Sequence, residues 1–378
     1  MQYKQFDGRQ LSMLGMGNMR LPRMPGSPSS FHGGAIDYGK AAEIIDYAMA
    51  SGINYYDTSH IYAGSEEFLG QALSKYPRES YVLCTKYNAM GGQDFEKHFE
   101  SQLERLKTEY VDVYMFQAVL NDQSADNYLN SGCIEYYQQL KKEGKIRYLG
   151  FSSHAPASTL KRFAAAHPWD MAMVQINYFD WAFAGADEQY QILNGLGIPI
   201  TVMEPLRGGR LASLSEAPSK LLKDFHPDWS FASWALRWLM GLEGVQVILS
   251  GMSAMEQIID NVATFANFSP LSAEEEAVLA EARDLLRGEI VVPCTECDYC
   301  LENCPEQLDI PQMMKAYNDL RIHSWAMSAP ITNKLREMEK TPADCTACAT
   351  CLEHCTQAID IPGIMEELAG RMEQRRRH

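Results

Sequence analysis

The chain has 378 residues, of which 46% are apolar, and this length predicts one large domain followed by a smaller one. The net charge of −16 argues against a nucleic-acid partner, because such proteins usually carry a basic surface. No segment approaches the roughly 20 apolar residues of a membrane span, and the N-terminus lacks a signal-peptide pattern. These features predict a cytoplasmic protein that binds neither nucleic acid nor membranes.

Short β-rich segments alternate with helical patterns through the first three quarters of the chain. The eight β-rich segments are 11–21, 53–59, 81–86, 111–117, 146–153, 171–178, 198–204 and 245–251. Eight strands that are each followed by a helix are typical of a (β/α)8 TIM barrel. A doubly wound sheet usually opens with a Gly-rich fingerprint, and LGMGNMRL (14–21) lacks its third glycine and the helix that should follow. We therefore predict a barrel in residues 1–285.

Four polar side chains come at the ends of the second, third and fourth predicted strands, where barrel enzymes carry their chemistry. They are Asp57, Tyr62, Lys86 and Gln117. A nearby ammonium lowers the pKa of a phenol from about 10, and a carboxylate anchors the ammonium. Tyr62 is therefore a candidate general acid. Gln117 can donate a hydrogen bond but cannot shuttle a proton. Taken singly, each residue also has an ordinary structural explanation, such as a helix cap or loop packing.

Eight of the ten cysteines lie near the C-terminus in two copies of the pattern C-x2-C-x2-C-x3-C. The second copy begins at Cys345, 51 residues after Cys294. In a chain without a signal peptide, this clustering predicts metal ligation in a reducing compartment rather than disulfides. Zinc sites favour two C-x2-C pairs with a longer spacer. The observed spacing fits two-cluster ferredoxins better, in which the fourth cysteine of each unit ligates the other cluster.

This rule predicts two [4Fe–4S] clusters. The first ligand set is Cys294, Cys297, Cys300 and Cys355, and the second is Cys345, Cys348, Cys351 and Cys304. Thr356 replaces the proline that follows the first unit at Pro305, which leaves all eight ligands in place. A helix-like stretch at 311–325 separates the units. It predicts a small helical, bacterial-type ferredoxin-like domain in residues 286–378.

Six segments of the first domain resemble, in order, those of the aldo-keto reductases. They are NYYDTSHIYAGSEEFLGQAL (54–73), the lysine of YVLCTK (81–86), GKIRYLGFSSH (144–154), VQINYFDW (174–181), TVMEPLRGG (201–209) and ILSGMSAMEQIIDNV (248–262). The resemblance covers about residues 1–285, and together with the cysteine repeat it points to the ferredoxin-fused branch of that family. It implies a barrel that binds a nicotinamide dinucleotide without a Rossmann domain.

The resemblance also implies residue roles. Tyr62 matches the proton donor, Lys86 and Asp57 the residues that tune it, and Gln117 the histidine that usually orients the substrate carbonyl. Ser152, Ser153 and Gln175 fall where the family holds the nicotinamide carboxamide. Met203 stands where many members stack an aromatic ring on the nicotinamide. Pro205, Leu206, Gly208, Ser250, Gly251, Gln257 and Asn261 fall along the pyrophosphate and adenosine path.

Two questions stay open at this level. Gly251 and Gln257 stand where NADPH-preferring members often supply a lysine and an arginine. NADH and NADPH are therefore both candidates, with Arg207 or Arg210 as sources of the missing charge. His60 and His154 are alternatives to the missing histidine, although either also suits an ordinary loop position.

The expected function is an NAD(P)H-dependent oxidoreductase that transfers hydride to a carbonyl or enone substrate. Hydride carries two electrons and each cluster carries one. Either a flavin, in the chain or in a partner protein, mediates between them, or the clusters are structural or regulatory. The alternative is a nucleotide-binding redox sensor or electron-carrier subunit that docks a partner protein and has little reductase activity.

Overall fold

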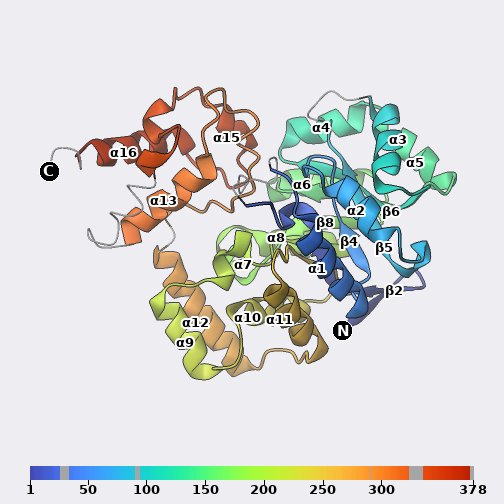
Figure 1. Ribbon diagram of the computed structural model, residues 1–378, viewed down its shortest axis with the longest axis horizontal. Helices are drawn as coiled ribbons and strands as arrows, with labels where there is room; N and C mark the ends of the chain where they lie inside the picture. Colours follow the sequence, from blue (N-terminus) through green and yellow to red (C-terminus); the bar gives the residue numbers. More distant parts are fainter. Residues whose placement is uncertain (26–33, 90–93, 290, 323–334, 375–378) are drawn as a thin grey trace. The chain divides into compact units, whose positions relative to one another are not determined.

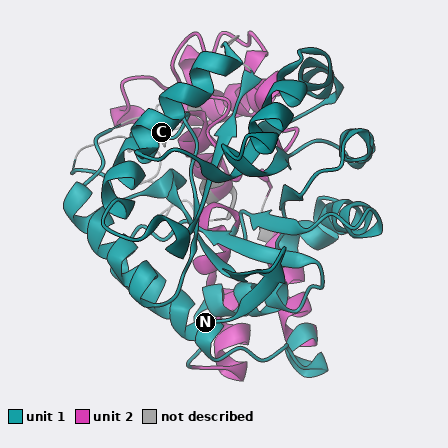
Figure 2. Cartoon of the chain, turned by 90° about the vertical axis from the view of Figure 1, so that its right-hand side faces the viewer, with its two compact units in different colours: residues 1–206, 228–276 teal, residues 207–227, 277–378 magenta. Residues whose placement is uncertain are grey.

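The computed structural model describes residues 1–25, 34–89, 94–289, 291–322 and 335–374. The chain forms two compact units, which Figure 2 distinguishes by colour. The first contains residues 1–206 and 228–276, and the second contains residues 207–227 and 277–378. The boundary expected after residue 285 remains a prediction.

The first unit contains a closed barrel of eight parallel strands, as predicted, in the order β10-β3-β4-β5-β6-β7-β8-β9 (Figure 1). The barrel strands are β3 (Leu14–Gly17), β4 (Tyr55–Asp57), β5 (Val82–Tyr87), β6 (Val111–Val119), β7 (Ile146–Ser153), β8 (Met171–Gln175), β9 (Ile200–Met203) and β10 (Val245–Ser250). The first and last of them are neighbours, with Ser250 opposite Met16.

Helices alternate with these strands along the chain. They are α1 (Tyr38–Ala50), α2 (Ser65–Leu73), α3 (Phe95–Leu106), α4 (Asp122–Asn130), α5 (Cys133–Lys142), α6 (Ala157–Ala166), α7 (Tyr178–Phe183), α8 (Ala186–Gly195), α10 (Phe231–Met240) and α11 (Met255–Ala266). Short 3-10 turns, η1 (Asn18–Arg20) and η2 (Arg78–Ser80), complete the connections.

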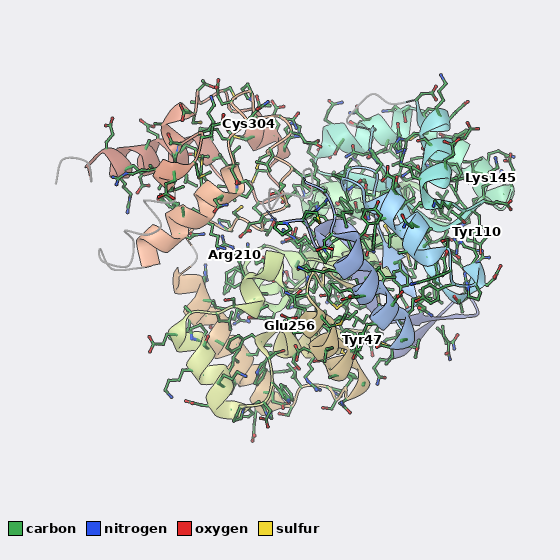
Figure 3. The ribbon with its side chains drawn as sticks, viewed as in Figure 1. Tyr47, Tyr110, Lys145, Arg210, Glu256 and Cys304 are labelled. Carbon is green, nitrogen blue, oxygen red and sulfur yellow. The ribbon has the colours of Figure 1, made fainter. Side chains whose placement is uncertain are left out.

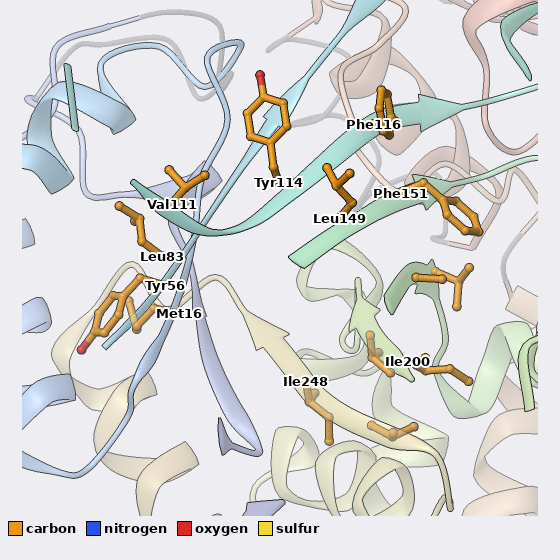
Figure 4. Close-up of a cluster of buried hydrophobic side chains, with 14 of the residues drawn as sticks. Met16, Tyr56, Leu83, Val111, Tyr114, Phe116, Leu149, Phe151, Ile200 and Ile248 are labelled. Carbon is orange, nitrogen blue, oxygen red and sulfur yellow. The ribbon is translucent and has the colours of Figure 1, made fainter. Parts of the chain in front are cut away.

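Alternation along the strands produces two apolar layers. Tyr56, Leu83, Phe116, Phe151 and Ile248 face the helices and belong to the larger core, part of which Figure 4 shows. The opposite faces fill the barrel interior with a smaller cluster, which includes Tyr55, Cys84, Val113, Met115, Met173 and Leu249. The interior is therefore a packed core, and functional groups are left to the strand ends.

The expected single strand at 11–21 is wrong in one respect, because it is divided. Its first residues belong to β2 (Arg9–Ser12), which pairs antiparallel with β1 (Tyr3–Phe6). The turn between them is Asp7–Gly8, with φ of 45° and 74°, as expected of a two-residue hairpin turn with positive φ at both positions. Phe6 and Leu11 join the interior cluster, so the hairpin covers the N-terminal end of the barrel.

The second unit is mainly helical. It contains η4 (Arg207–Ala212), α9 (Glu216–Phe225), most of α12 (Ala273–Glu289), α13 (Ile310–Ile322), η5 (Pro342–Asp344), α15 (Thr350–His354) and α16 (Ile361–Gln374). Residues 323–325 of the helix expected at 311–325 lie outside the described residues. No helix in the described ranges has the length and apolarity needed to cross a membrane.

The repeat in the sequence is also a repeat in the structure. Asp309 and Asp360, 51 residues apart, each accept a hydrogen bond from a backbone N–H three residues later, at Gln312 and Gly363. A carboxylate at this position satisfies donors that a helix start leaves unpaired. The two helices then contribute Met313, Met314, Met365 and Leu368 to one buried cluster.

A buried carboxylate ties the N-terminal end of the barrel together. Asp112, at the start of β6, is fully buried and accepts from Arg9 and Arg147 at 2.7 Å each. Its other oxygen lies 2.8 Å from an Arg78 nitrogen and accepts from the Leu83 N–H at 3.0 Å. One side chain therefore links the hairpin and strands β5, β6 and β7.

We expect Asp112→Ala to destabilise the protein by about 2–3 kcal/mol, because a buried donor and three arginines lose their partner, although the arginines retain some access to water. Urea unfolding measures the loss. Asp126→Ala is the control, since it removes an exposed carboxylate paired with Arg162 and should cost less than about 0.5 kcal/mol. Equal losses in the two variants would contradict the role given to Asp112.

Candidate active site and cluster sites

Three of the four predicted catalytic residues form a contact group at the C-terminal ends of β4 and β5. The Lys86 ammonium donates to both carboxylate oxygens of Asp57, at 2.6 and 2.7 Å, and to the Thr58 carbonyl at 2.8 Å. It also lies 5.2 Å from the centre of the Tyr62 ring. All three side chains are buried. Parallel strands that end at one rim explain why residues distant in sequence meet here.

The pKa of Tyr62 differs from the expectation that Lys86 would lower it. The pKa is raised well above 10, first by burial and then by the negative charges of Asp57, Cys84 and Glu204. The physical reason is first that burial disfavours the charged phenolate, and second that Asp57, which accepts from the ammonium through both oxygens, adds its own negative charge near the phenol. Tyr62 is therefore a neutral hydrogen-bond donor across the physiological pH range.

Gln117 lies at an irregularity in β6. The pairing of β6 with β7 shifts register after Phe116, and Ala118 adopts φ of 61°. Such a bulge redirects the side chains beside it. The Tyr128 hydroxyl donates to the Gln117 carbonyl at 2.5 Å, and the Ala118 N–H donates to Ser152 Oγ at 2.9 Å. These bonds hold the bulge in place.

The orientation of the Gln117 amide is also fixed. Ser59 Oγ donates to Gln117 Oε1 at 2.5 Å, which leaves the NH2 group for another partner. That nitrogen is buried and has no hydrogen-bond partner of regular geometry among the described residues. Contact with the Gln117 side chain lowers the pKa of Tyr62, against the larger effect of burial. Gln117 therefore lies beside Tyr62, and its NH2 group can donate a hydrogen bond to a ligand.

Two of the nearby histidines, His154 and His98, are poor proton donors. Burial lowers the pKa of His154 to about 4, partly opposed by a hydrogen bond with Gln175. Burial and the neighbouring His60 lower the pKa of His98 to about 3. The His60 ring lies 4.2 Å from that of His98, and its Nδ1 is 3.4 Å from the Lys86 carbonyl oxygen. His154 and His98 are thus neutral at physiological pH.

The predicted nicotinamide-binding residues lie on neighbouring strands. Ser152 and Ser153 end β7, and Gln175 and Met203 end β8 and β9. Ser153 Oγ donates to the Val119 carbonyl at 3.2 Å, and Gln175 Nε2 donates to Asp180 at 2.7 Å. Pro205 and Leu206 follow β9 in the same unit, whereas Gly208 belongs to the second unit and is described there.

Four of the seven residues expected along the pyrophosphate and adenosine path lie on or next to β10 and α11, namely Ser250, Gly251, Gln257 and Asn261. Asn261 Nδ2 donates to Ser250 Oγ at 3.1 Å, and both side chains are buried. Gln257 Oε1 accepts from the Ser253 and Ala254 N–H groups at 2.8 and 3.1 Å, so it caps the helix to which it belongs. Gly251 is exposed.

Arg20 is a residue that the sequence analysis missed. An ideal Cβ on Gly251 would lie 3.7 Å from the Cβ of Arg20, because β3 and β10 are adjacent in the closed barrel. Barrel closure could have predicted this proximity from the sequence. The first strand of a barrel pairs with the last, so the residues that follow these two strands lie at the same rim.

Ser59, which orients Gln117, was also missed, and nothing in the sequence singles it out.

The eight clustered cysteines line two pockets in the second unit. One is lined by Cys294, Cys297, Cys300 and Cys355, and the other by Cys304, Cys345, Cys348 and Cys351. These are the two sets expected from the sequence, and each takes three thiols from one repeat and one from the other. The pockets contain about 330 and 340 Å³ of empty space, open solvent included.

The donor set fits iron–sulfur clusters, which are held by four thiolates each. Within the described ranges, no group of three or more His, Cys, Asp or Glu side chains is close enough to hold a single metal ion. Burial raises the pKa of Cys294 and of Cys351 to about 11, so cluster binding there must displace protons.

Comparison with known proteins gives two family matches. The model described as the aldo/keto reductase family matches residues 13–284, and the 4Fe-4S dicluster domain matches residues 293–359. Aldo-keto reductase str7 of Strobilurus tenacellus is 30% identical over 228 residues, which cover 58% of this chain and 64% of that protein. The chain thus spans less than two thirds of that relative's length.

Two further relatives span more of their own length. The NADH-specific methylglyoxal reductase of Escherichia coli is 26% identical over 323 residues, covering 72% of this chain and 95% of that protein. The solved structure of aldo-keto reductase AKR11C1 from Bacillus halodurans, in its holo form, has a TM-score of 0.61 and 27% identity. It covers 75% of this chain and 96% of its own.

The Lys86–Asp57 pair generates a pH-dependent prediction. Burial already raises the pKa of Asp57, and Lys86 opposes that effect. Without the ammonium, the folded-state pKa rises further, so stability is lost as the pH rises through it. We expect Lys86→Met to lose about 3–5 kcal/mol at pH 8 and less at pH 5, as measured by urea unfolding.

The matched control is the double variant Asp57→Asn/Lys86→Met, which has no buried charge. It should recover most of the stability at pH 8 and show a flatter pH dependence. If the single and double variants are equally destabilised at both pH values, the loss comes from packing rather than from an unpaired carboxylate.

Proposed function

We propose that this chain, which belongs to the aldo/keto reductase family and carries a 4Fe-4S dicluster domain, uses NAD(P)H to reduce a small carbonyl or enone substrate. The observation that carries the proposal is the buried group of Tyr62, Lys86 and Asp57 at the barrel rim. In this group Tyr62 is a neutral acid, and the Lys86 ammonium is a cation held in a fixed position beside it.

The residues proposed to hold the dinucleotide are those at the ends of β7 to β10, chiefly Ser152, Ser153, Gln175, Ser250 and Asn261. Met203, Pro205, Leu206, Gly251 and Gln257 complete that set within the first unit. When bound, the dinucleotide supplies hydride, that is, one hydrogen and both electrons. A flavin has no support in the family matches and forms no part of the proposal.

Tyr62 donates its phenolic proton to the substrate oxygen while the new C–H bond forms and the C=O π bond breaks. The raised pKa of Tyr62 keeps this proton in place until charge develops on that oxygen. The Lys86 ammonium, 5.2 Å from the ring centre, stabilises the phenolate that remains. Asp57 holds Lys86 in position through both carboxylate oxygens.

Gln117 is proposed to hydrogen-bond the same substrate oxygen. Its carbonyl is engaged by Ser59, so the NH2 group is the one directed to a ligand. A neutral donor orients an oxygen without protonating it, which suits an aldehyde, a ketone or the carbonyl of an enone. The name of the Escherichia coli relative, a methylglyoxal reductase, supports a small dicarbonyl as the first compound to test.

We expect Tyr62→Phe to lower kcat/KM by about 10²–10⁴-fold, the usual contribution of a general acid. The measurement is oxidation of NADH and NADPH against methylglyoxal, a ketone and an enone. Since the pKa of Tyr62 is raised, its ionisation should not reduce the wild-type rate between pH 7 and about 10.

We expect Gln117→Leu to lower kcat/KM by about tenfold in the same assay, because it removes one hydrogen bond to the substrate oxygen.

The control is Tyr47→Phe, on helix α1, which should leave kcat/KM unchanged (Figure 3). If Tyr62→Phe retains wild-type kcat/KM on every active substrate, the proton-transfer proposal fails. The alternative, a nucleotide-binding sensor or electron-carrier subunit docking a redox partner, would then be favoured.

Arg20 is proposed to supply the cation that residues 248–262 lack. Its Cβ lies beside Gly251, the position at which the family resemblance puts a lysine in NADPH-preferring members. A guanidinium recognises phosphate through paired hydrogen bonds. Arg207 and Arg210, the other candidates, belong to the second unit.

We expect Arg20→Gln to weaken NADPH binding by about tenfold or more, as removal of a charge-assisted hydrogen bond does, and NADH binding by much less. Quenching of protein fluorescence measures both dissociation constants. Arg162→Gln, which removes an exposed arginine paired with Asp126, should alter neither. Equal losses for the two dinucleotides, or no loss for either, would contradict the assignment of Arg20 to the 2′-phosphate.

A further inference from the structure

Two arginines of the second unit have no role in the proposed reaction. Both lie on η4, where the backbone adopts φ of 50° at Arg207, 67° at Gly208 and 94° at Gly209. Conformations with positive φ are unfavourable for a residue with a side chain. Their occurrence at Arg207 indicates that neighbouring contacts fix this turn.

Arg207 is anchored next to the first cysteine pocket. Its side chain is only 1% exposed, and Nη2 donates to the carbonyl of Pro293 at 2.9 Å. Pro293 immediately precedes Cys294, which lines the pocket together with Cys297, Cys300 and Cys355. A buried guanidinium is costly unless it is hydrogen-bonded or faces negative charge.

Arg210, which Figure 3 labels, lies on the same turn and belongs to the second unit. Its Nε and Nη2 atoms are buried and have no hydrogen-bond partner among the described residues. Arg210 follows Arg207 by three residues on the turn that the hydrogen bond from Arg207 to Pro293 joins to the start of the first cysteine pocket. The turn therefore places a second guanidinium on the element that contacts the segment of Cys294.

The other pocket has a different environment. Cys348, one of its four thiols, is exposed. Glu306 lines that pocket and pairs at 3.6 Å with Lys340, whose side chain is 45% exposed. Water and mobile surface charges screen interactions there more strongly than in the buried pocket. The two cluster sites are thus electrostatically unequal.

We propose that Arg210, with Arg207, raises the reduction potential of the cluster held by Cys294, Cys297, Cys300 and Cys355 relative to that of the other cluster. Reduction adds one negative charge to a cluster, and nearby positive charge stabilises the reduced form. The opposing charges at this pocket are Asp298, which lines it, and Glu296. At equilibrium, a single electron added to this pair of clusters therefore resides mainly on the cluster held by Cys294 and its partners rather than on the cluster that includes Cys348.

The test is a potentiometric titration of the anaerobically purified full-length protein, followed by electron paramagnetic resonance without dinucleotide. In Arg210→Gln, we expect the reduced-to-oxidised ratio of one cluster at a fixed potential to fall by about tenfold, or about 59 mV for a one-electron couple. The other midpoint stays unchanged. Arg210→Lys, which keeps the charge, should preserve most of the wild-type value.

The matched control is Arg371→Gln, which removes a partly exposed arginine paired with Glu367 in the same unit and should move neither midpoint. Iron and sulfide analysis, at about eight of each per chain, shows which variants keep both clusters. Asp298→Asn tests the idea with the opposite sign, because it removes a negative charge at a positive-φ position that asparagine tolerates. It should raise the midpoint that Arg210→Gln lowers.

Two results would overturn the proposal. One is that neither Arg210→Gln nor Asp298→Asn changes a midpoint in protein that retains its iron. The other is that both midpoints shift equally, since a local charge cannot affect two unequal sites alike. Because the readout involves neither dinucleotide nor substrate, failure here is distinct from failure of the proposed carbonyl reduction.

Discussion

The ion pair between Lys86 and Asp57 is the constraint on which the barrel site depends. A lysine and an aspartate are buried together at neighbouring strand ends, and the ammonium opposes the rise that burial causes in the pKa of Asp57. Burial, together with the negative charge of Asp57, raises the pKa of the neighbouring Tyr62 phenol and keeps it neutral rather than ionised. The chemistry proposed for Tyr62 therefore begins with a protonated tyrosine, and the cation acts only when the proton leaves.

Much of this arrangement was predictable from the sequence, because its causes are local. The strand segments, the meeting of Asp57 and Lys86, and the grouping of the cysteines follow from alternation, spacing and the common rim of parallel strands. The pKa of Tyr62 was not predictable in that way. Its direction depends on how completely Asp57 neutralises Lys86 and how little water reaches the phenol, and both depend on three-dimensional packing.

Other differences have equally specific causes. The Asp7–Gly8 turn was visible in the sequence, but a continuous apolar pattern across residues 11–21 hid the break between two strands. Arg20 was hidden because its neighbour Gly251 is more than 200 residues away in the sequence and is brought close only by barrel closure. The amide orientation of Gln117 depends on a hydrogen bond from Ser59, and no motif in the sequence identifies Ser59 as its partner.

The two units present different kinds of site. The barrel rim has fixed hydrogen-bond donors and a single cation–carboxylate pair, an arrangement suited to moving a proton. The second unit has clustered thiols with one buried and one partly buried arginine, Arg207 and Arg210, an arrangement suited to holding and stabilising electrons. The groups suited to proton transfer thus lie in the first unit, and the groups suited to one-electron chemistry lie in the second.

Each cysteine pocket takes one of its four thiols from the other repeat, so the two repeats depend on each other for metal binding. A single repeat supplies only three thiols to a pocket, so neither half is a complete metal site by itself. Because metal binding and folding are coupled, occupation of one pocket draws the other repeat into position. Each repeat therefore completes the ligand set of the other, and the loss of either repeat would leave both pockets without four thiols.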